Sequence, residues 1–187
     1  MYKVHLENYL IFDKIKHFKK LEKLFIGLNK FSKGRIQDIN DESKYDLSSL
    51  KAIGLTKIWC DANGVKDLHF FKFKYLEEIY LSGNNINSID DIGLNCNVLL
   101  IKLIKIFWLS NNNLKEFLQL LKYRYLEEIG LSNNQINSLK NFGSFLSQLI
   151  HLKKLNIENN LIDYSLQGNK NVIEKAKEEY KDLRLGY

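Results

Sequence analysis

The sequence predicts one α/β solenoid, a curved right-handed coil of short stacked repeats. A parallel β-sheet is expected on its concave face, with short helices, 3-10 turns and loops on its convex face. Two segments 50 residues apart nearly coincide, YLEEIYLSGNNINSI at 75–89 and YLEEIGLSNNQINSL at 125–139. The chain of 187 residues contains no proline and no Gly/Ser-rich stretch that would separate domains. Self-similarity of this kind is typical of repeat architectures.

The pattern shared by the two segments is L-x-x-L-x-L-x-x-N-x-L, with other apolar residues allowed at the leucine positions. Aligned on the asparagine, its copies are separated by 34, 21, 28, 22 and 26 residues. The first half of each repeat therefore has a fixed length, whereas the return half varies. The six copies span Leu21–Phe31, Leu55–Val65, Leu76–Ile86, Ile104–Leu114, Leu126–Ile136 and Leu152–Ile162.

These residue types suit a stack of parallel strands. Side chains alternate between the two faces of a strand, so the residues that flank the middle x of L-x-L point inward and the middle residue points outward. One repeat cannot bury its apolar side chains alone, but strands stacked about 4.8 Å apart cover each apolar layer with the next. Residues one repeat apart in sequence are therefore expected to be neighbours in space.

The pattern resembles the signature of leucine-rich repeats, over residues 10 to 165. The shorter copies continue as Ile86-x-x-Ile89-x-x-Ile92 and Ile136-x-x-Leu139-x-x-Phe142. This continuation resembles the intracellular class with 22-residue repeats, which includes phosphatase-regulatory, spliceosomal and dynein light-chain members. The resemblance implies that the repeated asparagines hydrogen-bond the turn backbone, which would otherwise be buried unpaired. This asparagine ladder would comprise Asn29, Asn63, Asn84, Asn112, Asn134 and Asn160.

The solenoid is expected to be one continuous domain with a cap at each end. Residues 1–20 are predicted to form an N-terminal cap or degenerate repeat, 21–165 the six repeats, and 166–187 a C-terminal helical cap. We expect Asn171 to cap a helix from about residue 172 to 182. Its apolar residues recur at helical spacing, namely Val172, Ile173, Ala176, Tyr180 and Leu183. The long return at 32–54 either adds a convex helix around Asp46 to Ile53 or loops out.

A row of aromatic residues is the strongest candidate for a binding site. The outward position between the paired inward residues reads Phe25, Trp59, Tyr80, Trp108, Gly130 and Asn156 down the stack. Four of these six are aromatic, and Trp and Tyr are enriched at binding hot spots. The alternative is that aromatic residues simply favour strands and that neighbouring rings shield one another.

Charged residues of both signs flank this row. They include Glu78, Glu128, Lys57 and Lys105, and the acidic pairs 77–78 and 127–128 are expected to lie two strands apart. We therefore predict a protein partner on the concave face, with the carboxylates orienting it. Ordinary solvated charges are the alternative reading. The full predicted site is Phe25, Trp59, Tyr80, Trp108, Glu78, Glu128, Lys57, Lys105 and Asn156.

The sequence gives no reason to expect an enzyme, a cofactor or a metal site. The adjacent carboxylates at 77–78 have no neighbouring feature that would desolvate them or supply a second catalytic group. His5, His17, His69 and His151 form no metal-ligand spacing, and no Gly-Lys-Ser/Thr phosphate loop occurs. Cys60 and Cys96 have neither metal-binding nor redox spacing.

The net charge of +6 is spread along the chain without an aromatic-plus-basic motif, which disfavours nucleic acid as the partner. No signal-peptide segment or membrane-spanning run occurs in the sequence, so we predict that the protein is cytoplasmic, with the nucleus also compatible. We also predict that the chain by itself is a monomer. The predicted function is an adaptor, scaffold or regulatory subunit that binds a protein. Two alternatives follow from the resemblance, namely a spliceosomal-type ribonucleoprotein component and a regulator of a phosphatase-like enzyme.

Overall fold

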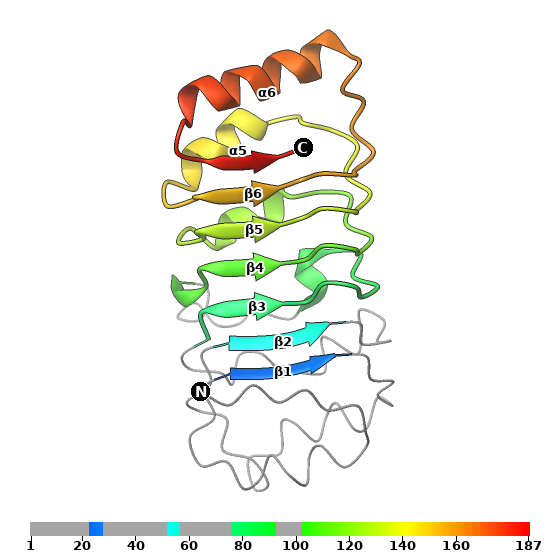
Figure 1. Cartoon of the computed structure of the whole chain (residues 1–187), viewed down its shortest axis with the longest axis vertical. Coiled ribbons are helices and arrows are strands. Elements are labelled where there is room, and N and C mark those ends of the chain that lie inside the picture. Colours follow the sequence, from blue (N-terminus) through cyan, green and yellow to red (C-terminus); the bar gives the residue numbers. More distant parts are fainter. Residues whose placement is uncertain (1–22, 28–51, 57–75, 93–101) are drawn as a thin grey trace, which may run out of the picture.

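A computed structural model of the chain describes residues 23–27, 52–56, 76–92 and 102–187. In these residues seven short strands stack in chain order into one parallel sheet, with all arrows pointing the same way (Figure 1). The strands are β1 (Lys23–Gly27), β2 (Ala52–Thr56), β3 (Glu78–Tyr80), β4 (Ile106–Trp108), β5 (Glu128–Gly130), β6 (Lys154–Asn156) and β7 (Arg184–Gly186). The helical elements are η2 (Ile89–Ile92), η4 (Leu118–Lys122), α5 (Phe142–Gln148) and α6 (Gln167–Glu179). The predicted α/β solenoid with a parallel sheet is confirmed.

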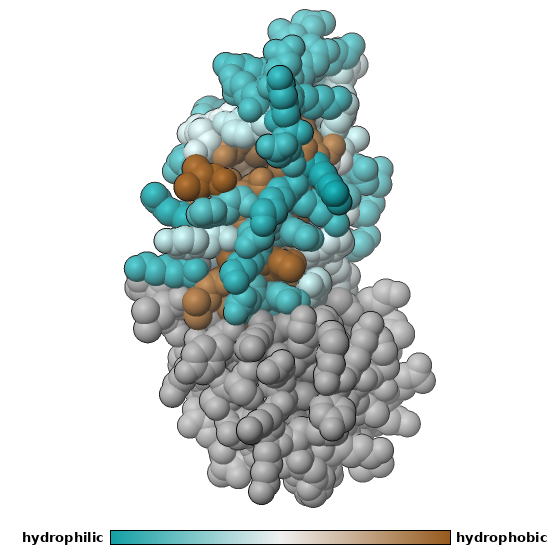
Figure 2. Space-filling model, turned by 60° about the vertical axis from the view of Figure 1, so that its left-hand side comes forward, coloured by the Kyte–Doolittle hydropathy of each residue, from teal (hydrophilic) through white to brown (hydrophobic). Residues whose placement is uncertain are grey.

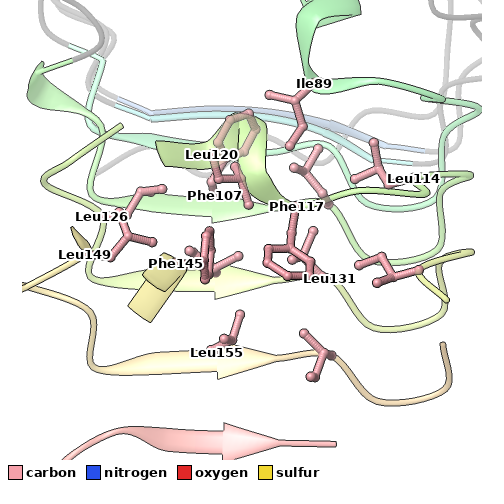
Figure 3. Close-up of a cluster of buried hydrophobic side chains, with 14 of the residues drawn as sticks. Ile89, Phe107, Leu114, Phe117, Leu120, Leu126, Leu131, Phe145, Leu149 and Leu155 are labelled. Atoms are coloured by element: carbon pink, nitrogen blue, oxygen red, sulfur yellow. The ribbon is translucent and has the colours of Figure 1, made fainter. Parts of the chain in front are cut away.

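The core lies on one side of this sheet. The middle residues of β3 to β6 are at most 1% exposed, namely Ile79, Phe107, Ile129 and Leu155. Leu120 of η4 and Phe145 of α5 pack against these strands, as Figure 3 shows. Helical segments therefore cover the core face, and the other face of β3 to β6 carries the partly exposed side chains.

A tight turn after each of β3 to β6 requires a residue with positive φ. Gly83, Asn111, Asn133 and Asn159 occupy it, with φ of 74°, 57°, 54° and 54°. Glycine adopts this left-handed conformation without steric cost, and asparagine tolerates it better than most residues. The dipeptides Gly-Asn and Asn-Asn, one of which follows each of these strands, therefore favour the turn.

The asparagine that follows each of these residues ties neighbouring repeats together. The Nδ2 of Asn112 donates to the carbonyls of Leu81 and Leu109, both at 2.9 Å, and its Oδ1 accepts from the amide of Ile86 at 3.0 Å. Asn134 and Asn160 make the equivalent bonds one and two repeats later. Asn84 donates to the carbonyl of Leu81 at 2.8 Å. Asn29 and Asn63 lie outside the described residues.

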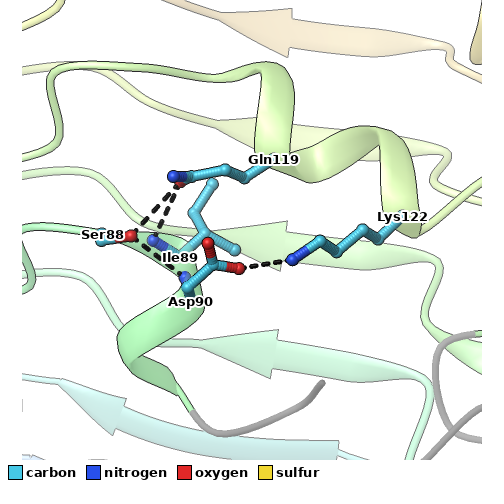
Figure 4. Close-up of polar contacts among 5 residues, drawn as sticks. All are labelled: Ser88, Ile89, Asp90, Gln119 and Lys122. Atoms are coloured by element: carbon cyan, nitrogen blue, oxygen red, sulfur yellow. Dashed lines mark hydrogen bonds and ion pairs between the residues drawn. The ribbon is translucent and has the colours of Figure 1, made fainter. Parts of the chain in front are cut away.

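Side chains also link successive returns on the core side of the sheet. The Oε1 of Gln119 in η4 accepts from the amide of Ile89 at 3.3 Å and lies 3.5 Å from the hydroxyl of Ser88 (Figure 4). Lys122 pairs with Asp90 beside them. The variable returns are thus held to each other by polar contacts as well as by the core.

The second repeat differs from the prediction. The register pairs Gly54 of β2 with both Phe25 of β1 and Tyr80 of β3. Gly54 therefore occupies the sheet position predicted for Trp59, which lies outside the described residues, and the first three strands are separated by 29 and 26 residues instead of 34 and 21. A convex helix reaching Ile53 is also wrong, because β2 begins at Ala52.

The C-terminal end contains a helix and a strand. The helix α6 begins at Gln167, so Asn171 lies inside it and accepts a hydrogen bond from Gln167 Nε2 at 2.6 Å. The prediction that Asn171 caps the helix was wrong. The predicted apolar face does contact the core, because Ile173 and Ala176 are 3% and 4% exposed. The strand β7, which pairs with β6, was not predicted.

A buried hydroxyl in the core leads to a first testable prediction. Tyr123 is fully buried with its ring 5.5 Å from that of Phe107, and among the described residues its hydroxyl has no hydrogen-bond partner. Burial, with a smaller effect of Asp90, raises the pKa of Tyr123. An unpaired buried polar group costs free energy, so Tyr123→Phe is expected to raise the free energy of unfolding by about 1 kcal/mol. Urea unfolding measures this.

The matched control for this substitution is Tyr125→Phe, because Tyr125 is 49% exposed and its hydroxyl is free to meet water. We expect no measurable change there. A loss of stability in Tyr123→Phe larger than in the control would show that the hydroxyl has a bound partner such as water.

Candidate protein-binding face

The residues that alternate with the buried ones define an open face of the sheet. We call its two rows the first-position row and the third-position row, after their place in the three-residue strands. The first-position row contains Lys23, Ala52, Glu78, Ile106, Glu128, Lys154 and Arg184. The third-position row contains Phe25, Gly54, Tyr80, Trp108, Gly130, Asn156 and Gly186.

Two of the predicted aromatic residues are neighbours in the third-position row. The rings of Tyr80 and Trp108 lie 6.5 Å apart with 33° between their planes, and both side chains are partly exposed. The register places Phe25 in the same row. Gly54 occupies the place predicted for Trp59, and Trp59 and Lys57 lie outside the described residues. The aromatic site is therefore centred on β3 and β4.

Gly130 gives Trp108 room to lie over the next strand. A Cβ atom at Gly130 would lie 3.2 Å from Cδ2 and Cε3 of the Trp108 ring. The segments LEEIYLS and LEEIGLS around Tyr80 and Gly130 differ only at this position. Because position 130 is glycine and not tyrosine, the indole of Trp108 lies over the place where a second tyrosine side chain would otherwise stand.

Lys154 reaches the same indole from β6, two strands away. Its Nζ lies 4.7 Å from the centroid of the Trp108 ring and 3.8 Å from Oε2 of Glu128. An ammonium over an indole face is attracted by the negative charge of the ring face. Trp108 and Glu128 together therefore form a site that binds the Lys154 ammonium group.

Ion pairs run along the residues that directly precede the strands. Lys105 contacts Glu77 at 2.7 Å and Lys153 contacts Glu127 at 2.6 Å. The hydrogen bond to Glu77 raises the pKa of Lys105. The hydrogen bond from Lys153 lowers the pKa of Glu127. These pairs are largely exposed and contribute little to stability. Lys105, which we predicted to contact the partner, has an intrachain carboxylate as its neighbour.

The remaining predicted residues also make intrachain contacts. Tyr80 donates its hydroxyl to Oε2 of Glu78 at 3.1 Å. Burial and this carboxylate raise the pKa of Tyr80 to about 12, so the hydroxyl is protonated at neutral pH. Asn156 accepts from the amide of Glu158 at 2.9 Å. The predictions did not identify Lys154 over Trp108, because nothing in sequence links residues 46 positions apart except the strand stacking itself.

Within the described ranges, no three His, Cys, Asp or Glu side chains gather to hold a metal ion. Neither helix there has the length and apolar character that a bilayer crossing needs. His151 stacks on Tyr125, 5.4 Å between ring centroids. In Figure 2 hydrophilic residues cover most of the coloured surface, and hydrophobic residues appear in smaller areas between them.

Solved structures with the same fold are leucine-rich-repeat proteins. An internalin from Listeria monocytogenes superposes with a TM-score of 0.55 at 16% identity, over 91% of this chain and 42% of that one. A leucine-rich-repeat protein from Leptospira interrogans gives 0.58 at 24% identity, over 93% of this chain and 39% of that one. This chain thus spans about two fifths of those structures. No protein-family model and no curated protein matches the sequence. The fold is a leucine-rich-repeat solenoid.

Proposed function

We propose that this chain is a non-catalytic adaptor, scaffold or regulatory subunit that holds a protein partner on its open sheet face. The pair formed by Tyr80 and Trp108 carries this proposal. Both rings are partly exposed at the centre of the described sheet, and they present a large rigid surface at little entropic cost. Buried tyrosine and tryptophan anchors supply much of the affinity of protein interfaces.

Charge on the same face favours a protein over nucleic acid. On β3 to β5 and the residues just before these strands, the charged residues are Glu77, Glu78, Glu127, Glu128 and Lys105. Lys153 and Lys154 pair with Glu127 and Glu128, so the face carries four carboxylates against three ammonium groups, a balance that does not attract a phosphate backbone. The ribonucleoprotein alternative would therefore need a different surface, and salt-sensitive RNA binding by the isolated chain would support it.

The finer assignments rest on the sequence. We infer that these residues form one continuous domain, monomeric and cytoplasmic, with caps at 1–20 and 166–187. One spacing in the register supports the resemblance to the intracellular class with 22-residue repeats, because the paired residues Trp108 and Gly130 are 22 positions apart. Regulation of a phosphatase-like enzyme is one form that the proposed function would take, and identification of the partner decides between it and a scaffold.

The test compares proteins captured from an extract of the source cells by the parent chain and by Trp108→Ala. Removal of an aromatic hot-spot residue is expected to weaken binding by about 2 kcal/mol or more. Partners captured by the parent chain should therefore be lost, and quantitative mass spectrometry measures this. The same enrichment should fall with Tyr80→Ala.

The matched control is Tyr125→Ala, which removes an exposed ring that stacks on His151 away from the two rows. This variant is expected to capture the same proteins as the parent chain. Equal capture by Trp108→Ala, with its fold verified by circular dichroism, would rule out the open face as the binding site.

A further inference from the structure

The position of the Lys154 ammonium indicates what chemistry the open face recognises. Its Nζ lies over the Trp108 ring at 4.7 Å and 3.8 Å from the Glu128 carboxylate. The Lys154 side chain is partly exposed, with 40% of its area accessible. Its two partners come from β4 and β5, whereas Lys154 belongs to β6.

We propose that this place is the docking point for a lysine or arginine side chain of the protein partner, and that Lys154 occupies it as a competitor until the partner displaces it. The inference rests on the proposed function, because it names the chemistry of the partner that the open face binds.

Three features of the place fit a partner's cation. The Trp108 indole offers its face to a charge, and Glu128 offers an acceptor beside it. Ile106 lies between Glu78 and Glu128 in the first-position row, so an aliphatic stem has an apolar neighbour. On β3 to β6 and the residues just before them, four glutamates stand against three lysines, although the chain as a whole is +6.

The geometry of Lys154 allows it to be displaced. A contact between an exposed lysine and an aromatic ring has a modest strength, as has an exposed ion pair at 3.8 Å. An arginine of a partner would stack on the indole with a planar group that loses less entropy for each hydrogen bond. Lys154 can then move into solvent without leaving a buried charge.

The difference between Lys154 and Lys153 provides a matched pair of variants. Lys153 is adjacent in sequence, carries the same charge and pairs with Glu127 at 2.6 Å. Lys154→Met and Lys153→Met therefore change the net charge equally and keep an unbranched stem. Only the first removes the ammonium over Trp108.

The probe is N-acetyl-arginine amide, titrated against each full-length variant while the indole N–H signals are followed by NMR. The two tryptophans are distinguished with Trp59→Phe. N-acetyl-citrulline amide, which is nearly isosteric and neutral, is the ligand control. The proposal predicts that arginine amide shifts the Trp108 signal and citrulline amide does not.

Lys154→Met is expected to tighten arginine amide binding about two- to fivefold, the factor that corresponds to one exposed cation–π contact. Lys153→Met should stay at the parent value, and Glu128→Gln should weaken binding. Equal shifts with citrulline amide, or no gain in Lys154→Met over Lys153→Met, would overturn the proposal.

These outcomes are separable from those of the proposed function. If arginine amide fails to bind but partner capture still depends on Trp108, only the inference about the cation is wrong. If arginine amide binds as expected but partner capture is unaffected by Trp108→Ala, the cation site stands and the open face is not the partner's binding site.

Discussion

Phe117→Ala is expected to lower the free energy of unfolding by about 3–5 kcal/mol, the range found when a buried phenylalanine is truncated in a core. Phe117 is 4% exposed, and its ring meets Phe145 and Phe142 edge to face at 4.8 and 5.8 Å. These partners belong to α5, whereas Phe117 directly precedes η4. The alanine variant would therefore leave a cavity between two successive returns of the solenoid (Figure 3).

Urea unfolding followed by far-UV circular dichroism measures the change, with Ile150→Ala as the control. Ile150 is 79% exposed, so its truncation should alter stability by less than about 0.5 kcal/mol. Since each repeat contacts only its neighbours, the Phe117 variant is also expected to unfold in a broader transition. A loss below about 1 kcal/mol would mean that the two returns collapse around the missing ring.

The repeats from β3 to β6 were predictable because two independent signals agree in each. The first signal is the set of apolar residues at the inward positions, which fixes the strand. The second is the dipeptide Gly-Asn or Asn-Asn in the turn. At Asn111 and Asn112 the first residue adopts positive φ and the second bonds the neighbouring turn. Because both the backbone conformation and the hydrogen bonds of the turn require particular residues, these repeats can be aligned with each other in few ways.

The second repeat was misaligned because only one of these signals was used. Cys60 and Asn63 match the pattern by residue type, but Ala62 precedes Asn63 where the described turns have Gly or Asn. Alanine seldom adopts positive φ. The aliphatic residues Ile53 and Leu55 flank Gly54 equally well, and that is where β2 forms.

The candidate site was predictable to the level of strand neighbours and no further. Stacking of repeats places Tyr80 beside Trp108, because residues in register on adjacent parallel strands are close in space. The position of Lys154 depends on side-chain conformations across two strands and on the space that Gly130 leaves for the indole. Sequence periodicity contains no information about such conformations. The strand β7 was missed for a related reason, since three residues are too few to show a period.

The link between fold and site explains why the next substitution should matter for both. The turns that hold neighbouring repeats also fix the spacing of the strands, and the spacing fixes how Tyr80, Trp108 and Lys154 meet. Loss of one ladder asparagine would therefore disturb the open face as well as stability, even though the asparagine lies beyond the strand ends.

Asn134→Ala is accordingly expected to lower the free energy of unfolding by about 3 kcal/mol. Asn134 is 6% exposed; its Nδ2 donates to the carbonyls of Leu109 and Leu131, each at 3.0 Å, and its Oδ1 accepts from the amide of Leu114 at 3.0 Å. The alanine variant leaves the Leu114 amide without its acceptor in a turn largely closed to water, whereas the carbonyls of Leu109 and Leu131 keep the bonds from Asn112 and Asn160. The unsatisfied amide costs about 1–3 kcal/mol and each lost bond to a carbonyl about 0.5–1.5 kcal/mol, and relaxation of the turn offsets part of the sum.

Thermal and urea unfolding of Asn134→Ala and Asn113→Ala provide the comparison. Asn113 has the same residue type and lies next to a ladder position, but its Oδ1 accepts one bond, from Gln135 Nε2 at 3.3 Å, at a partly buried site. Its substitution should cost less than about 1 kcal/mol. Equal losses in the two variants would contradict the role of Asn134, because the cost would then follow from removing any turn asparagine instead of from its three bonds, two of which reach the preceding repeat.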